Sequence, residues 1–399
     1  MHNWKLFAAL GARAMQTTAL AVDDLPPAGI DRATPGAHQL LYTGRTGTLF
    51  AIFFKNLALT IITLGLYRFW AKTRERRFLW SSTSIDGEPF EYTGTGKELF
   101  IGFLKAMLIL VPVFAALQFL HLWLGEADVT LAMALQYAQT FAILVLIYAG
   151  TYAARRYRMS RTLWRGIRFR QLGSAWRYVG HALPGLFLCV ITLGFYFPYF
   201  QTRLLRYETD NLSFGSEKFR FTGKGGEMFG RFVACWLLGL LMFALLIVAF
   251  AGIVVGMLGL GMLNSDPEQL ATDTANMIAA GLAVIACVYL AMGLTFVVVG
   301  TWYQSKFWRF RAAHTHCEDL HFAMPDVSTG KLMRLLLGNW ALMLVSFGLL
   351  RPLATQRSMR FWCNHLQIAG TLDFERIAQA EAGPRSGEGL AGFFDIDLG

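Results

Sequence analysis

Three pairs of arginines have the most regular spacing among the residues of this sequence that could do chemistry. They lie in three segments that align without a gap, residues 62–80, 191–209 and 345–363, and the members of each pair are three residues apart. On a helix this spacing puts both guanidinium groups on one face, where they suit the phosphates of anionic lipids. The alternative is that they only orient the chain in a membrane. The pairs are Arg74 and Arg77, Arg203 and Arg206, and Arg357 and Arg360.

One cluster holds side chains that could bind a metal: His314, His316, Cys317 and His321. Its spacing matches no standard zinc pattern, and no further pair of cysteines or histidines completes a tetrahedral set. We therefore interpret these four as ordinary loop residues and leave a zinc site as the alternative. The sequence has no hydrolase or metalloprotease motif and no close pair of carboxylates, so we predict no enzymatic activity and no cofactor.

The composition is that of a membrane protein. The chain has 399 residues, of which 55% are hydrophobic and 16% charged, against roughly 25% charged residues in soluble domains. Its mean hydropathy is +0.43. The net charge of +10 fits lysines and arginines retained on one side of a bilayer better than a nucleic-acid partner.

A glycine precedes each arginine pair at a constant distance. We interpret Gly65, Gly194 and Gly348 as the turn between an apolar segment and a basic helix. A stretch at 84–100 predicts a β-hairpin around Asp86-Gly87, and it recurs at 213–229. The sequence therefore predicts internal repeats: a disordered lead-in at 1–40, repeats at 41–190 and 191–344, a partial third repeat at 345–377, and a disordered tail at 378–399.

Two long apolar regions, 100–153 and 230–303, each predict two membrane-spanning helices, since about 20 apolar residues cross a hydrocarbon core. No lysine or arginine occurs from 106 through 154 or from 232 through 305, which places both chain termini in the cytoplasm by the positive-inside rule. The three repeated segments are short or contain proline, so we predict re-entrant, interfacial or short spanning elements. The predicted fold is an all-α polytopic membrane protein with small cytoplasmic β-hairpins.

Three motifs together resemble the YjgN-like family of bacterial inner-membrane proteins, whose domain has no known function. They are ITLGLYRFWAKTRERRFLW at 62–80, FEYTGTGKELF at 90–100 and RMSRTLWRGIRF at 158–169. The resemblance extends over about residues 41–375. It implies a multi-pass protein of the bacterial cytoplasmic membrane and brings no catalytic residues. The stretch at 305–324 departs from the third motif.

Two functions are compatible with these features. The first is a structural membrane protein that interacts with anionic lipids through the arginine pairs. The second is a transporter or channel for a small solute, which broken helices in repeated positions would favour. The predicted spans contain no ionised residue of the kind that coupled transporters keep near the midplane, so we favour the first. Membrane lipids are then the expected partners, and the oligomeric state is left open.

Overall fold

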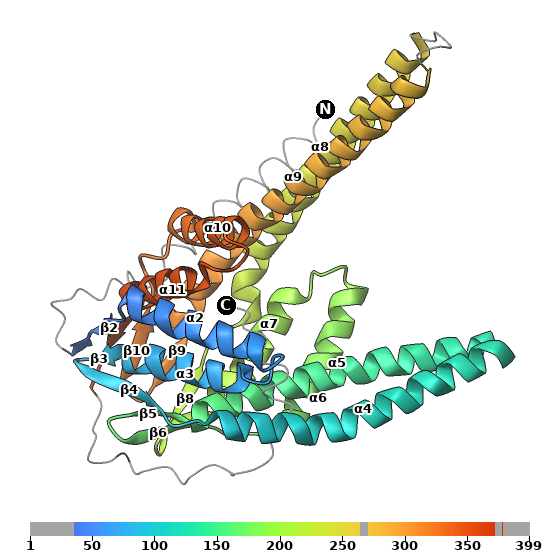
Figure 1. Cartoon of the computed structure of the whole chain (residues 1–399). Coiled ribbons are helices and arrows are strands. Elements are labelled where there is room, and N and C mark those ends of the chain that lie inside the picture. Colours follow the sequence, from blue (N-terminus) through green and yellow to red (C-terminus); the bar gives the residue numbers. More distant parts are fainter. Residues whose placement is uncertain (1–35, 264–269, 372–376, 378–399) are drawn as a thin grey trace, which may run out of the picture.

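The computed structural model describes residues 36–263, 270–371 and 377, and in these ranges pairs of helices alternate with pairs of short strands (Figure 1). The helices are α2 (Thr46–Ile62), α3 (Arg68–Ser81), α4 (Gly96–Ala127), α5 (Val129–Ser160), α6 (Ala175–Ile191), α7 (Phe197–Asp210), α8 (Gly225–Leu263), α9 (Leu270–Ala313), α10 (Thr329–Val345) and α11 (Arg351–His365). The strands are β1 (Ala37–His38), β2 (Leu40–Tyr42), β3 (Thr83–Ile85), β4 (Glu88–Tyr92), β5 (Thr162–Trp164), β6 (Ile167–Gln171), β7 (Leu212–Phe214), β8 (Glu217–Phe221), β9 (Thr315–Cys317), β10 (Leu320–Ala323) and β11 (Gln367–Ala369).

All eleven strands form one antiparallel sheet in the order β1-β11-β10-β9-β8-β7-β6-β5-β4-β3-β2. β1 and β2 stand at opposite ends of this order, yet only Gln39 separates them in the chain. The segment therefore pairs with β11 through His38 and with β3 through Leu40, which joins the two edges of the sheet. We call this junction between β1 and β2 the seam. Asp86 stabilises the seam, because its Oδ1 accepts a hydrogen bond from the Gln39 N–H at 2.9 Å. The result is a near-barrel, in which almost no strand edge is left open.

The sheet shows that the predicted all-α fold class is wrong. The hairpins predicted at 84–100 and 213–229 correspond to β3–β4 and β7–β8, but they are parts of a continuous sheet. The third motif, at 158–169, forms the end of α5, strand β5 and the first residues of β6. Strands of two to five residues give a weak periodic pattern. Pairings between hairpins join residues far apart in the chain, so no local pattern reveals them.

Two of the hairpin turns show why the strands pair as they do. Asp86 and Gly87 have φ values of +52° and +85°, and Arg165 and Gly166 have +49° and +75°. Positive φ at both central residues defines the type I′ turn, whose twist matches that of two antiparallel strands. A glycine at the second position makes this conformation accessible in both hairpins.

Inward-facing side chains of the near-barrel form an apolar core that is not completely filled. Phe90, Trp164, Phe169, Phe214 and Phe219 are among the residues around a cavity of about 380 Å³. Apolar side chains that border an unfilled space lose part of the van der Waals contacts that a fully packed core would provide.

The helices pack on one another in chain order, and α11 packs on α2, so the helix contacts close into a ring. Four helices are long and apolar enough to cross a bilayer, as predicted. They form the pairs α4–α5 and α8–α9, which project from the strand-bearing end in different directions (Figure 1). The qualifying parts are Gly96–Leu124, Val129–Ser160, Gly225–Gly256 and Gly281–Ala313.

Some predicted segments lie partly outside the described residues. Of the lead-in at 1–40, the structure describes only 36–40, which contain β1 and the first residue of β2. The tail at 378–399 lies outside the described residues. The three predicted repeats all contribute strands to the same sheet.

Candidate functional site

Three tight turns join the short helices into helical hairpins. They lie between α2 and α3, between α6 and α7, and between α10 and α11, at the predicted glycines. Gly65, Gly194 and Gly348 have φ values of +90°, +91° and +85°. Each hairpin is thus closed by a glycine in a conformation that other residues rarely adopt.

Every backbone N–H in the turn at 63–67 donates a hydrogen bond within its hairpin. The Gly65 N–H donates to the Thr60 carbonyl at 2.7 Å, which is the bond that closes a helix in the Schellman motif. The Tyr67 N–H donates to the Thr63 hydroxyl at 3.0 Å and ties the second helix to the turn. The other two turns repeat each of these bonds. The N–H groups of a turn bonded in this way need no water as a partner.

The residue before each glycine points a large apolar side chain away from the protein. Leu64, Leu193 and Phe347 are 94%, 74% and 96% exposed, and their φ values are +51°, +51° and +49°. This left-handed conformation costs a residue with a side chain about 1 kcal/mol. Burying such a side chain in an apolar medium contributes about 1.5–3 kcal/mol, which exceeds the strain. The tips are therefore better suited to lipid than to water.

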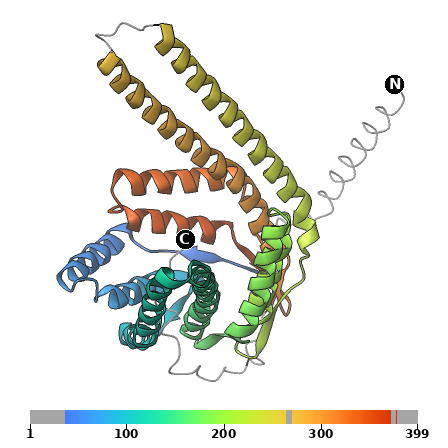
Figure 2. The ribbon, with the colours of Figure 1, turned by 90° about the vertical axis from the view of Figure 1, so that its right-hand side faces the viewer.

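In the third hairpin the exposed apolar surface is not limited to the tip but continues along helix α10. Leu336, Trp340 and Leu344 are four residues apart and exposed, so they form one stripe that leads to Phe347. Tryptophan is enriched where a membrane meets water. In Figure 2 the α10–α11 hairpin runs obliquely across the direction of α8 and α9. If α8 and α9 cross the membrane, this hairpin does not run parallel to them.

The structure places the six predicted arginines in different surroundings. Arg77 donates from Nη2 to the Gly94 carbonyl at 2.9 Å, and Arg206 donates from Nη2 to the Gly223 carbonyl at 2.7 Å. Each of these guanidinium groups thereby fastens a helix of one hairpin to the glycine turn that follows a strand. We infer that these two arginines hold the fold together.

The first arginines of the same two pairs each lie near a ring side chain. The guanidinium carbon of Arg74 lies 5.8 Å from the centre of the Tyr67 ring, within cation–π range. Arg203 is close enough to His181 to affect its charge: burial lowers the pKa of His181, and the positive charge of Arg203 lowers it further. His181 is therefore more readily neutral than an ordinary histidine.

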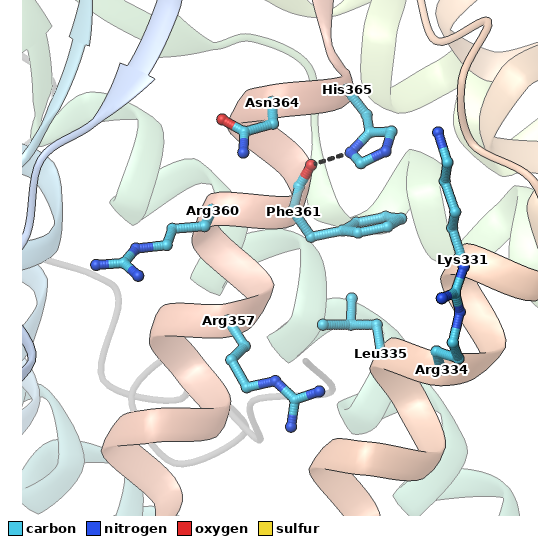
Figure 3. Close-up of a pocket in the computed structure, with 8 residues that line it drawn as sticks. All are labelled: Lys331, Arg334, Leu335, Arg357, Arg360, Phe361, Asn364 and His365. Atoms are coloured by element: carbon cyan, nitrogen blue, oxygen red, sulfur yellow. Dashed lines mark hydrogen bonds between the residues drawn. The ribbon is translucent and has the colours of Figure 1, made fainter.

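The third pair lines an open basic pocket between α10 and α11 (Figure 3). The pocket has a volume of about 560 Å³, and Lys331 and Arg334 of α10 face it from the other side. Arg357 points toward the space between the helices, whereas Arg360 points away from α10 (Figure 3). Among the described residues, the remaining lining groups are Leu335, Phe361, Asn364 and His365, and none of the lining residues is acidic.

Local structure brings these positive charges together. Ser328 caps α10 by accepting from the Lys331 N–H at 3.3 Å, so the two α10 cations lie in the first two turns, near the positive end of the helix dipole. Gly338 lets the Arg357 guanidinium lie against α10, because a Cβ there would be 2.7 Å from Nη2. Lys331, Arg334 and Arg357 place three positive charges at one opening without an acidic partner among the lining residues, an arrangement that can attract a phosphate or carboxylate group.

The structure does not bring the four residues of the possible metal cluster together around one point. Cys317 lines the cavity inside the near-barrel, and burial raises its pKa to about 12. His316 and His321 pair through their Nδ1 atoms at 3.0 Å, and His314 Nε2 lies 3.1 Å from a carboxylate oxygen of Glu227. Alternation along β9 sends His316 and Cys317 to opposite faces. Within the described residues no group of three or more metal-binding side chains is close enough to hold an ion.

Five residues of these sites were not predicted from the sequence: Leu64, Leu193, Phe347, Lys331 and Arg334. The first three occupy one column of the repeated segments, immediately before the glycine, and this aligned apolar column is a signal that could have identified them. Their left-handed conformation and exposure have no signal in the sequence. Lys331 and Arg334 had no counterpart in the arginine pairs, and only the packing of α10 on α11 brings them to Arg357.

Comparison with known proteins identifies relatives in bacterial membranes. Residues 37–393 match the family described as bacterial protein of unknown function (DUF898). The chain is 36% identical over 88 residues to the inner membrane protein YjgN of Salmonella typhimurium, which is 22% of each chain. Proteins of the same name from two Escherichia coli strains are 31% and 29% identical over 133 residues, or 33% of this chain and 31% of each relative. These matches thus span a third or less of the relatives' length. No solved structure matches the chain significantly.

Proposed function

Because this chain belongs to the DUF898 family, whose curated relatives are inner-membrane proteins, we propose that it is an inner-membrane protein that binds the head groups of anionic lipids. The predicted resemblance to the YjgN-like family is confirmed by these matches. The observation that carries the lipid-binding proposal is the basic pocket of Lys331, Arg334, Arg357 and Arg360 beside the exposed apolar stripe of α10. A lipid offers an anionic head group and an apolar chain in the same arrangement.

In this proposal the α10–α11 hairpin lies in the membrane interface. Its apolar stripe, from Leu336 to Phe347, enters the boundary between head groups and acyl chains, to a depth of about 5–10 Å. The hairpin then lies along the membrane surface, so its tip and its basic pocket are at similar depth. Arg351, one turn from the tip, stays within reach of the head groups by extending its long side chain. The pocket is then level with the lipid phosphates.

The other two helical hairpins support the same arrangement at their tips. Leu64 and Leu193 would enter the lipid as Phe347 does, since the N–H groups of their turns have the same partners within the hairpin. The proposal retains the predicted topology, in which positive residues and both termini are cytoplasmic and the hairpins enter from that side. Arg77 and Arg206 bind the protein's own backbone in this arrangement, so the third pair is the one that serves lipid.

Head-group selectivity tests the proposed function directly. The purified full-length protein is reconstituted in nanodiscs that contain equal amounts of phosphatidylglycerol and phosphatidylcholine. The protein is then released from the nanodiscs in the mass spectrometer, and the lipid molecules that stay bound to it are counted by native mass spectrometry. We expect phosphatidylglycerol to be retained in excess, and the excess to shrink at high salt because the pocket is open to solvent. Equal retention of the two lipids would contradict the proposal.

A further inference from the structure

The cavity inside the near-barrel is a second possible binding site, distinct from the basic pocket. Its volume of about 380 Å³ falls in the range of small-molecule sites, roughly 300–1,000 Å³. All eleven strands contribute side chains to its wall, and most of these are aromatic or aliphatic. Among the described residues, the wall has no carboxylate, lysine or arginine. A ligand with charged groups along its buried length would find no partner there.

The few polar groups in the wall already have partners. Nδ1 of His38 lies 2.5 Å from an Asp86 carboxylate oxygen, and its Nε2 bonds the Gly370 carbonyl at 2.9 Å. The Thr83 hydroxyl donates to the Leu79 carbonyl at 2.9 Å. A buried water needs two to four polar partners, and this wall offers few. The cavity is therefore poorly suited to ordered water.

Burial also keeps the two thiols in the wall neutral. It raises the pKa of Cys317 to about 12 and that of Cys363 to about 11. Neither thiol carries charge at physiological pH, so neither draws ions or water into the cavity.

The cavity lies at the end of the helices that are long and apolar enough to cross a membrane. The strands of its wall lead directly into the long apolar helices: α4 begins four residues after β4 ends, and β9 begins two residues after α9 ends. Helix α11 separates the cavity from the basic pocket. Met359, Trp362 and Cys363 of this helix face the cavity, whereas Arg357 and Arg360 line the pocket.

We propose that the cavity of the near-barrel holds one alkyl chain of a membrane lipid. A chain of methylene groups needs no polar partner, and the volume suits one such chain better than a whole two-chain lipid. The helices joined to the wall are long and apolar enough to cross a membrane, so membrane lipid is the expected source of this chain. This proposal does not depend on the anion site, because it uses the opposite face of α11.

Photolabelling identifies the occupant. The full-length protein in nanodiscs is exposed to palmitic acid that carries a diazirine near the end of its chain, and in parallel to phosphatidylglycerol with the same reactive group in one chain. We expect adducts on wall residues such as Phe219, Leu320 and Phe322, and we expect excess unlabelled palmitate or phosphatidylglycerol to reduce them. Labelling by the free acid alone would identify a fatty acid as the source, and labelling by both would include intact lipid; either result supports the proposal.

Variants that fill the cavity provide the control. Cys317→Phe places a ring inside the cavity, and we expect it to lower wall adducts at least threefold. Cys287→Phe makes the same substitution on the exposed surface of α9 and should leave them unchanged. If Cys317→Phe does not fold, as judged by gel filtration and circular dichroism, Ile368→Trp on β11 is the second filling variant.

Three results would overturn the proposal. Adducts confined to α4, α5, α8 and α9 would show that lipid stays outside the near-barrel. Wall adducts could also persist both with excess unlabelled lipid and in a folded filling variant. That result would show that the probe labels the wall non-specifically. Crosslinks from a photoreactive residue at position 219 to residues 378–399 would show that the chain fills its own cavity.

Discussion

Removing two charges from the basic pocket should weaken anionic lipid binding by a predictable amount. Arg357→Gln and Arg334→Gln remove one charge from each of the two helices that line the pocket. A lysine or arginine near a membrane surface contributes about 1 kcal/mol to the attraction of anionic lipid. The double variant should therefore bind about 2 kcal/mol more weakly, which is roughly thirtyfold in Kd.

The assay is a titration of short-chain phosphatidylglycerol into the protein in nanodiscs of phosphatidylcholine, at low and at physiological salt. A matched control is Lys218→Gln with Arg220→Gln, which removes two charges from the exposed side of β8. We expect the control to bind like the wild type. Arg360→Gln alone should have a smaller effect than Arg357→Gln, because Arg360 points away from α10 (Figure 3).

Lipid binding at the basic pocket is refuted if the two double variants lose the same affinity. That result would mean that lipid responds to net charge and not to the pocket. Unchanged affinity in the pocket variant would equally exclude the pocket as the binding site. Melting temperatures of all variants should stay close to that of the wild type, since neither Arg334 nor Arg357 is buried among the core residues.

Three further predictions follow from the fold. A fluorescent NBD label on Phe347→Cys should shift to the blue and be quenched by doxyl lipids, whereas a label on Glu88→Cys, at an exposed strand position, should show neither effect. The pKa of Asp86 lies below its ordinary value: burial raises it, but bonds from the Gln39 N–H and His38 lower it more. Its ionised form thus stabilises the seam above the ordinary pKa, and this contribution is lost as pH falls through the folded value, so melting temperature should decline in acid below about pH 4 and Asp86→Asn should flatten that decline. The Cys363 thiol, with its pKa raised to about 11, should react with maleimide at pH 8 on the order of a hundred times more slowly in the folded protein than in denaturant.

Part of the candidate site could be predicted from the sequence. The aligned glycines Gly65, Gly194 and Gly348 marked the tips, because a turn of positive φ needs glycine at a fixed place in the chain. The arginine pairs marked basic helices, but not their roles. A guanidinium group at Arg77 or Arg206 binds a backbone carbonyl, and one at Arg357 faces an open pocket. Spacing along a helix is the same in both cases, and only the neighbouring element differs.

The sequence by itself determined the four long apolar helices, since length and hydropathy are local properties of the chain. It also determined two of the β-hairpins through Asp86-Gly87 and the alternating residues of β7 and β8. Only the tertiary structure decided that every hairpin joins one sheet, and that His38 and Leu40 close it through β11 and β3. The physical reason is that strand pairing, the apolar cavity and the basic pocket depend on contacts between residues distant in the chain, which leave no periodic trace in the sequence between them.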